Sequence, residues 1–117
     1  MICETFNNSD FYMIEGSQQI ISVELYNVFG ESYSNIIISK IEWRLSKYGE
    51  TECLVSKNSE SELSDIQYDK NVIDVVLTAN DTMGLYGKFT HQIIIEDYKN
   101  NIFVVDLGKI SIKPQIK

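Results

Sequence analysis

The stretch that decides the fold is residues 72–95, VIDVVLTANDTMGLYGKFTHQIII. β-Branched and aromatic residues fill its two ends, 72–77 and 88–95, whereas Gly, Asn and Asp punctuate the segment 80–87 between them. Strands are rich in the first group of residues and turns in the second. The stretch therefore predicts two strands of an antiparallel sheet joined by a compact turn.

The remainder of the C-terminal third supports this prediction. Two more extended runs follow, at 102–105 and 107–112, and Pro114 comes after them, where it can end pairing without disturbing a ladder. Within the preceding turn, we expect Asp81 and Thr82 to accept hydrogen bonds from nearby backbone N–H groups. The sequence thus favours a sheet over any catalytic loop in this region.

A regular alternation of apolar and polar side chains marks the earlier strands. It is clear in residues 21–26 and strictest in 40–47, a segment that a Gly-containing turn connects to the next run, 51–56, as in a hairpin. Such patterning is typical of a sheet with one face on a core and the other in water. The residues that we expect in the core are Ile21, Val23, Leu25, Ile41, Trp43, Leu45, Val75, Leu77, Phe89, Ile93 and Ile95.

Two of these strands favour an immunoglobulin-like sandwich. Trp43 lies centrally in the expected third strand, where such domains bury a Trp, and Phe89 precedes His91 at the spacing of the tyrosine corner and its cysteine. The chain has two cysteines, Cys3 and Cys53, which lie far apart in the sequence, so we expect two reduced thiols. The fold class predicted is all-β, an immunoglobulin-like antiparallel sandwich of about seven to eight strands without a disulfide.

Length and charge narrow the classes of protein. The chain has 117 residues, enough for one domain, and we expect a flexible lead-in over 1–10 followed by a single sandwich over 11–117. With 10 Lys and Arg against 17 Asp and Glu, the net charge is −7, which disfavours nucleic acid and anionic membranes as partners. The N-terminal residues lack the pattern of a secretory signal, so we expect the protein in the cytoplasm.

The sequence indicates no catalytic residue, metal ligand or cofactor. His91, the one histidine, alternates with inward residues and is expected to be structural, with its ring nitrogens hydrogen-bonded. The polar segment 57–71 is expected to be an irregular loop, with one helical turn over 61–66 as a variant. A hydrolase that uses its paired carboxylates is a minor alternative to simple solvation. The carboxylates concerned are those of Glu60, Glu62, Asp65 and Asp69.

Tyrosines are numerous and provide a second alternative. Carbohydrate-binding modules that share the sandwich architecture stack aromatic faces on sugar rings, and tyrosine is equally frequent at protein interfaces. The sequence reveals no aligned strip among them. The tyrosines are Tyr12, Tyr26, Tyr33, Tyr48, Tyr68, Tyr86 and Tyr98.

A family resemblance adds to this interpretation. It is carried by strand and turn patterns at 11–16, 21–25, 81–82, 85–89, 108–112 and Pro114. These segments resemble the small β-sandwich domains of tailed-phage structural proteins, and are most similar to the N-terminal domain of the phage baseplate upper protein family and its short stand-alone relatives. The resemblance extends from Phe11 to Ile116 and is weakest over 36–71.

The resemblance implies a non-enzymatic part of a virion or tail-like particle. Such a protein would be assembled in the cytoplasm of a bacterial host and would attach to other phage structural proteins or to further copies of itself. Since exposed strand edges can add to a partner's sheet, we expect the first or the last strand to supply the contact. The interface residues expected are Phe11, Met13, Ile110 and Ile112. A carbohydrate-binding module of a host-recognition particle remains the alternative.

Overall fold

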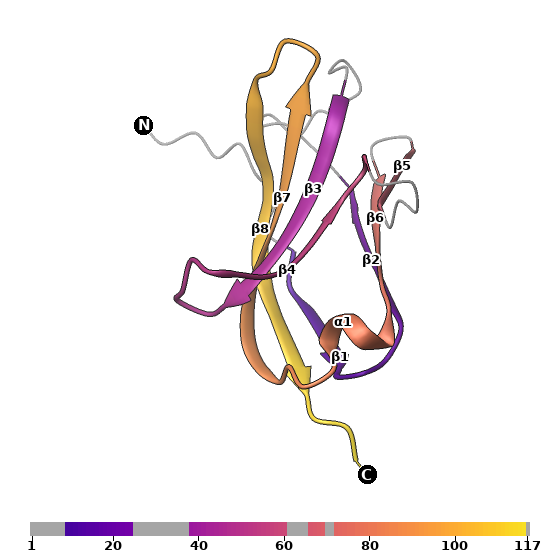
Figure 1. Ribbon diagram of the computed structural model, residues 1–117, viewed down its shortest axis with the longest axis vertical. Helices are drawn as coiled ribbons and strands as arrows, with labels where there is room; N and C mark the ends of the chain where they lie inside the picture. The colour runs from indigo at the N-terminus through magenta and orange to yellow at the C-terminus, as the bar shows by residue number, and fades with distance from the viewer. Residues whose placement is uncertain (1–8, 25–37, 61–65, 70–71, 117) are drawn as a thin grey trace.

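The computed structural model describes residues 9–24, 38–60, 66–69 and 72–116, which fold into two facing sheets (Figure 1). Leu25 and residues 1–8 of the lead-in lie outside this part of the chain. The elements that it contains are β1 (Phe11–Ile14), β2 (Gln19–Glu24), β3 (Ile38–Lys47), β4 (Cys53–Asn58), β5 (Ile66–Asp69), β6 (Val72–Leu77), α1 (Ala79–Thr82), β7 (Gly87–Asp97) and β8 (Ile102–Lys113).

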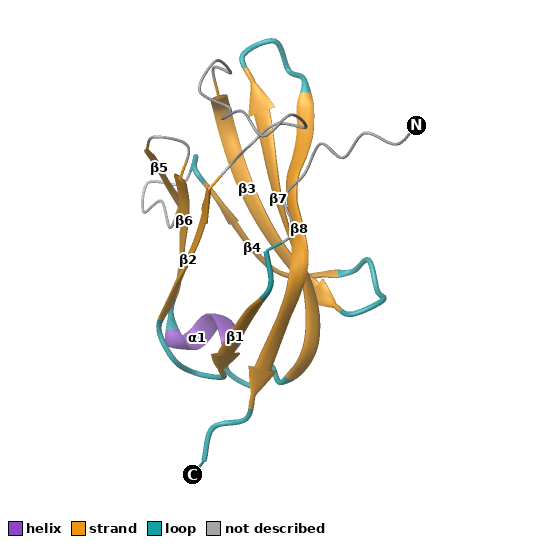
Figure 2. Ribbon diagram, turned by 180° about the vertical axis from the view of Figure 1, so that it is seen from behind, coloured by secondary structure: helices purple, strands orange, loops and turns teal. Residues whose placement is uncertain are grey.

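The strands form a sandwich of unequal sheets. The large sheet has the order β1-β8-β7-β3-β4 and the small sheet has the order β2-β6-β5. All neighbours are antiparallel except β1 and β8, which run parallel. α1 lies at the lower end of the molecule beside β1 (Figure 2). The predicted all-β sandwich of seven to eight strands is therefore confirmed.

The core fills the space between the sheets as the alternation predicts. Every described residue expected there is buried, and Trp43, Ile93 and Ile95 have no exposed surface. Register explains the packing, because Trp43 lies opposite Ile93 and Ile41 opposite Ile95 on the inner face of β3 and β7. The expected β3–β4 hairpin is also present, closed by a turn in which Glu50 N–H donates to the Lys47 carbonyl.

The segment 57–71 corrects one prediction. Part of it forms β5, which pairs antiparallel with β6 and places Ile66 in the core opposite Val75. Of the helical turn considered over 61–66, only Ile66 is among the described residues, and it is extended. The strand escapes detection because only Ile66 and Tyr68 alternate inward among polar neighbours, too short a pattern to indicate a strand.

The last two runs also differ from expectation, because they form one strand. β8 continues through Asp106, which the sequence suggests as a break, and the register with β7 shifts between Ile93 and Ile94. Val105 is the extra residue of this β-bulge, so Val105 and Asp106 are both buried although they are adjacent. A bulge redirects side chains in this manner, and here it turns a carboxylate into the core.

The end of the expected flexible lead-in is attached to the large sheet. The Ser9 carbonyl lies 2.7 Å from His91 Nε2, and Asp10 Oδ1 accepts the Lys109 backbone N–H at 2.8 Å. Gly108 permits this approach, because a Cβ on it would lie 1.9 Å from the Ser9 carbonyl oxygen. The lead-in is therefore held from Ser9 onward, since the buried His91 ring needs a partner.

The expected interface residues also require a correction. Met13, Ile110 and Ile112 are buried in the core and Phe11 packs against it, so their side chains are not available to a partner. Residues 110–112 of β8 are also paired on both sides, with β7 and with β1. β1 remains at the edge of the large sheet, and its outward side chains are Tyr12 and Ile14.

The inner and outer faces of β3 provide the first test. Trp43→Ala should lower the free energy of unfolding by about 3–5 kcal/mol, because a fully buried indole is replaced by a cavity. Arg44→Ala, which removes an exposed side chain paired with Glu42, should change it by about 0.5 kcal/mol or less. Urea unfolding measures both, and equal effects would mean that the register is inverted.

Gly108 provides the second test. Gly108→Ala should displace Ser9 and leave the buried His91 N–H without an acceptor, which costs about 1–3 kcal/mol. Urea unfolding measures this loss, and faster amide exchange at Lys109 should accompany it because Asp10 is displaced too. Ser111→Ala on the outer side of the same strand is the control, and an equal loss in both variants would contradict the proposed contact.

Candidate functional site: a tyrosine and lysine face on the large sheet

His91 is a structural residue of the core, as the sequence predicts. Its ring has no exposed surface, and Trp43 Nε1–H donates to His91 Nδ1 at 3.1 Å. The proton must therefore lie on Nε2, which donates to the Ser9 carbonyl. Burial lowers the pKa of His91 below its usual value, against the raising effect of the Ser9 carbonyl, so the ring is neutral.

Asp106 is the unexpected polar residue of the core. It is fully buried, and neither carboxylate oxygen has a well-formed hydrogen bond within the described residues. The nearest basic atom, His91 Nε2, lies 3.8 Å from Oδ2. Burial raises the pKa of Asp106 to about 7, although polar groups of Ser9 and Leu107 act in the opposite direction. With no access to solvent, this pair is not a site for substrate.

The acidic segment and the turn before β7 form no catalytic arrangement among the described residues. Glu60 is exposed with its carboxylate 4.0 Å from Lys40 Nζ, whereas Glu62, Asp65 and the side chain of Asp69 lie outside the described part. Asp81 accepts the Thr78 N–H at 2.7 Å, as expected, and it also contacts Lys57 Nζ at 2.8 Å. Thr82 differs from the expectation, because its hydroxyl accepts the distant Gly16 N–H at 2.9 Å.

Two further properties concern the described residues as a whole. They include no group of three His, Cys, Asp or Glu side chains that could hold a metal ion. They also include no helix with the length and apolar character needed to cross a bilayer. Cys53, at the start of β4, is an exposed free thiol.

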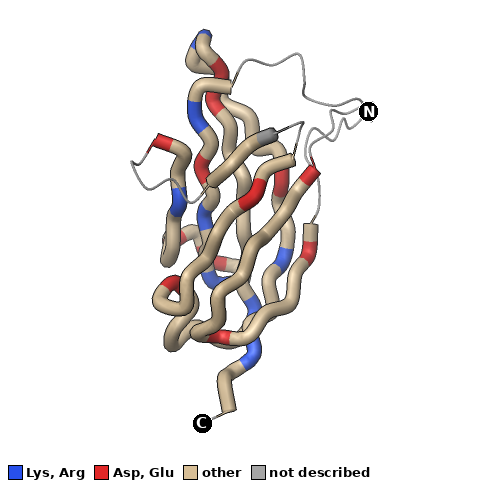
Figure 3. The backbone as a smooth tube through the Cα atoms, turned by 90° about the vertical axis from the view of Figure 1, so that its right-hand side faces the viewer, with Lys and Arg blue, Asp and Glu red and all other residues tan. Residues whose placement is uncertain are grey.

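Charge is distributed unequally between the two sheets. The strands β2, β5 and β6 contain acidic residues but no Lys or Arg, and Figure 3 shows red without blue on the small sheet. Among the described strands, every Lys and Arg belongs to the large sheet, and three of them lie at exposed positions near its lower end. They are Lys88 on β7 and Lys109 and Lys113 on β8.

Tyrosines border the same region. Register places Tyr12 of β1 beside Ser111 of β8, and Ser111 beside Lys88 of β7. Tyr48 follows β3 directly, and its backbone N–H donates to the Lys88 carbonyl at 3.1 Å. Tyr12 and Tyr48, 80% and 52% exposed, thus lie on either side of the two central strands.

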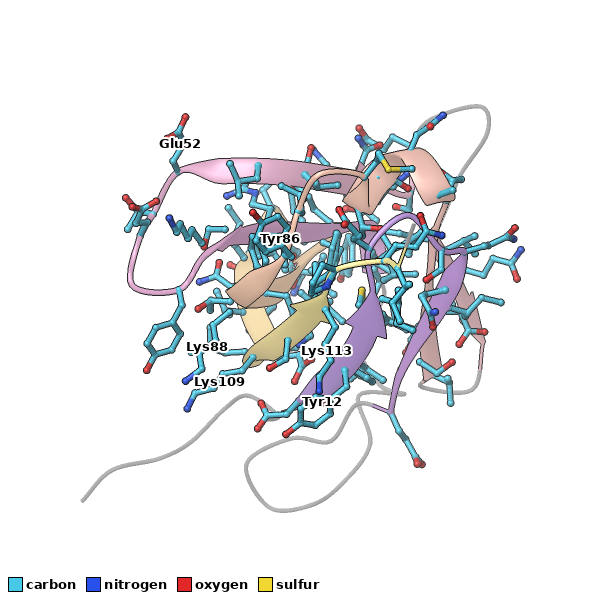
Figure 4. The ribbon with its side chains drawn as sticks, turned by 90° about the horizontal axis from the view of Figure 1, so that it is seen from below. Tyr12, Glu52, Tyr86, Lys88, Lys109 and Lys113 are labelled. Atoms are coloured by element: carbon cyan, nitrogen blue, oxygen red, sulfur yellow. The ribbon has the colours of Figure 1, made fainter. Side chains whose placement is uncertain are left out.

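These side chains surround a hollow of about 310 Å³ on the outer face. The Lys109 ammonium lies 5.5 Å from the centroid of the Tyr48 ring, within the range of a cation–π contact. Viewed from below, Lys88 and Lys109 extend in the same direction, away from the ribbon and on the side opposite Glu52 (Figure 4). The residues that line the hollow are Asp10, Phe11, Tyr12, Tyr48, Lys88, Lys109 and Ser111.

Two smaller hollows, each of about 230 Å³, lie higher on the same face. Both are lined by Arg44 together with acidic residues, and the guanidinium already pairs with Glu42. They therefore lack the excess of positive charge found in the lower hollow.

The lower hollow is a site that the sequence alone does not reveal. Alternation correctly indicates that Tyr12, Lys88 and Lys109 face outward, because each adjoins an inward residue in its strand. It does not indicate that they are neighbours, which depends on the order β1-β8-β7-β3. Tyr86 and Tyr98 are exposed elsewhere, Tyr68 is part of the small sheet, and Tyr26 and Tyr33 lie outside the described residues.

Comparison with solved structures supports the fold. The chain is similar to the fibronectin(III)-like modules of Clostridium thermocellum CbhA, with a TM-score of 0.54, 15% identity, and 96% of each chain covered. At this identity the similarity shows the fold alone, and it confirms the predicted immunoglobulin-like sandwich. No family model matches the chain, and no curated protein sequence is significantly similar to it.

The buried carboxyl of Asp106 leads to a pH-dependent prediction. Between about pH 4 and about pH 7 the folded chain keeps a proton that the unfolded chain releases, so the free energy of unfolding should fall as pH rises through this window. The slope attributable to Asp106 is at most about 1.4 kcal/mol per pH unit. Below about pH 6.5 the lowered pKa of His91 contributes a slope of opposite sign.

Asp106→Asn separates the two contributions, because the variant keeps His91. The free energy of unfolding of the wild type minus that of Asp106→Asn should fall from about pH 4 to about pH 7 and level off above it. Urea unfolding at several pH values measures this difference. A difference independent of pH would contradict an uncharged buried Asp106.

Proposed function

We propose that this chain is a non-enzymatic attachment module that acts through protein–protein contacts at the β1 edge of its large sheet. The observation that carries the proposal is the outward side of β1. Ile14 is 51% exposed and Tyr12 is 80% exposed, on a strand that pairs on one side only among the described residues. A short edge strand with exposed apolar side chains offers both backbone and side-chain contacts to a partner.

The way in which β1 is held suits a contact surface. β1 pairs with β8 over Phe11–Ile14, and the Glu15 N–H then donates to the Lys113 carbonyl at 2.9 Å. The buried Glu15 carboxylate accepts the backbone N–H groups of Gly84 and Gln115. Because these bonds fix the strand before a partner arrives, binding would require little further ordering of the backbone.

The resemblance to the phage baseplate upper protein family supports a more specific proposal. In this proposal the partners are other structural proteins of a virion or tail-like particle, or further copies of the chain, which meet it in the cytoplasm of the bacterial host. Particles of this kind repeat their contacts by symmetry. Weak individual contacts at β1 would then be multiplied by the number of copies.

A carbohydrate-binding module of a host-recognition particle is the second candidate. The observation that favours it is the hollow between Tyr12 and Tyr48, two exposed aromatic rings on one face. The two candidates share Tyr12 but differ in Ile14, which does not line the hollow, and in Lys88 and Lys109, which do. They can therefore be tested separately.

A pair of matched isoleucines tests the attachment proposal. Ile14→Glu should greatly reduce incorporation of the chain into particles isolated from the producing bacterium, because it places a charge on the proposed contact. The fold should be retained, since position 14 is exposed and lies opposite Lys113. Quantitative mass spectrometry of the purified particles measures incorporation.

Ile20→Glu is the control, because Ile20 is 62% exposed on β2 of the opposite sheet. It should leave incorporation unchanged. Normal incorporation of the Ile14→Glu variant, or absence of the wild-type chain from the particles, would contradict the attachment proposal.

A further inference from the structure

Two lysines lie close together on the outer face of the large sheet, although the chain as a whole is acidic. Lys88 is opposite Ser111, and Lys109 is opposite Thr90, so the two lysines occupy diagonal positions on β7 and β8. Such positions are about 7–8 Å apart between backbone atoms, and like charges at this range repel. Lys113 lies on the same face, two residues beyond Ser111.

These lysines have no anionic partner within the described residues. None of the three has a carboxylate within ion-pair distance there, although the whole chain has seven more acidic than basic residues. The carboxylate that lines the hollow, Asp10, directs Oδ1 to the backbone N–H of Lys109. The lining of the hollow thus has two basic residues and one acidic residue, and this excess of positive charge, with Lys113 nearby, favours a negatively charged ligand.

The aromatic side chains indicate what else such a ligand contains. The exposed rings of Tyr12 and Tyr48 border the hollow, and the hydroxyl-bearing Ser111 lies between them in the sheet. Aromatic faces pack well against the C–H groups of a sugar ring, while phenol and serine hydroxyls bind sugar hydroxyls. A volume of about 310 Å³ lies at the small end of ligand sites and matches one or two rings better than a long polymer segment.

We propose that this hollow binds an acidic sugar, a ring with one carboxylate or phosphate group that Lys88 and Lys109 hold between Tyr12 and Tyr48. The inference deepens the carbohydrate-binding candidate and rests on it. An acidic peptide is less suited, because it would extend beyond a concave site of this size. The charged group supplies most of the attraction, and the aromatic faces supply selectivity for a ring.

Isothermal titration of the purified chain tests the proposal with five probes. They are galacturonate, glucose 6-phosphate, uncharged galactose, inorganic phosphate and an oligo-glutamate peptide. Saturable binding is expected for galacturonate, for glucose 6-phosphate or for both, and the stronger of the two identifies the charged group. Affinity should fall as salt is added, because the lysines are exposed.

Variants locate the site. Lys88→Ala, Lys109→Ala and Tyr12→Ala should each weaken binding of the acidic sugar at least about tenfold. The matched control is Lys99→Ala, because the Lys99 ammonium lies 5.5 Å from the Tyr98 ring, as Lys109 does from Tyr48, but neither residue lines the hollow. This control should bind like the wild type.

Several results would overturn the inference. They are equal affinity for galactose, equal affinity for inorganic phosphate, preference for the peptide, an equal effect of Lys99→Ala, or no binding of either acidic sugar. If Ile14→Glu entered the particles normally, the attachment proposal would fail but this inference would not. If no acidic sugar bound, this inference would fail but the attachment proposal would not. The two hypotheses therefore fail independently.

Discussion

The structure depends on a buried imidazole whose two nitrogens must both be satisfied. Immunoglobulin domains have a disulfide beside their central tryptophan. At the corresponding place this chain has His91, which accepts a hydrogen bond from Trp43. That bond fixes the proton on Nε2, so an acceptor is needed on the other side of the ring, and the Ser9 carbonyl supplies it. The contact in turn requires a residue without a side chain at position 108. One polar residue in the core thereby determines how the chain enters the sandwich.

The alternation of side chains predicted most of this architecture, because period two is a local property and inward positions are apolar. Trp43 and its inner-face neighbours follow it strictly. It failed where a strand was too short to alternate, as in β5, and where a bulge changed the phase, as at Val105. Alternation also could not predict the contact of Ser9 with His91, because any residue at position 9 would have the same backbone carbonyl.

The candidate site differs from the core in this respect. Outward positions such as Tyr12 and Lys109 follow from the same alternation, but a binding surface consists of neighbours from different strands. Those neighbours come from the order of strands in the sheet, which period two does not specify. Nor does the fibronectin(III)-like fold assign a role, because many unrelated functions share such sandwiches. Function has to be argued from the side chains on the outer face.

The pairing of β1 with β8 also has a consequence for how the chain reaches its native state. Phe11 of the first described strand aligns with Ile110 of the last, so the pairing that completes the large sheet joins residues from the two ends of the described chain. Pairings between such distant residues are slow to form, because the entropy of closing a long loop is lost before the contacts stabilise the sheet. On the ribosome, the early strand would have to wait, unpaired, until nearly all of the described residues had left the exit tunnel. Premature association through its exposed backbone is then a hazard of synthesis, and chaperone binding during this interval would lessen it.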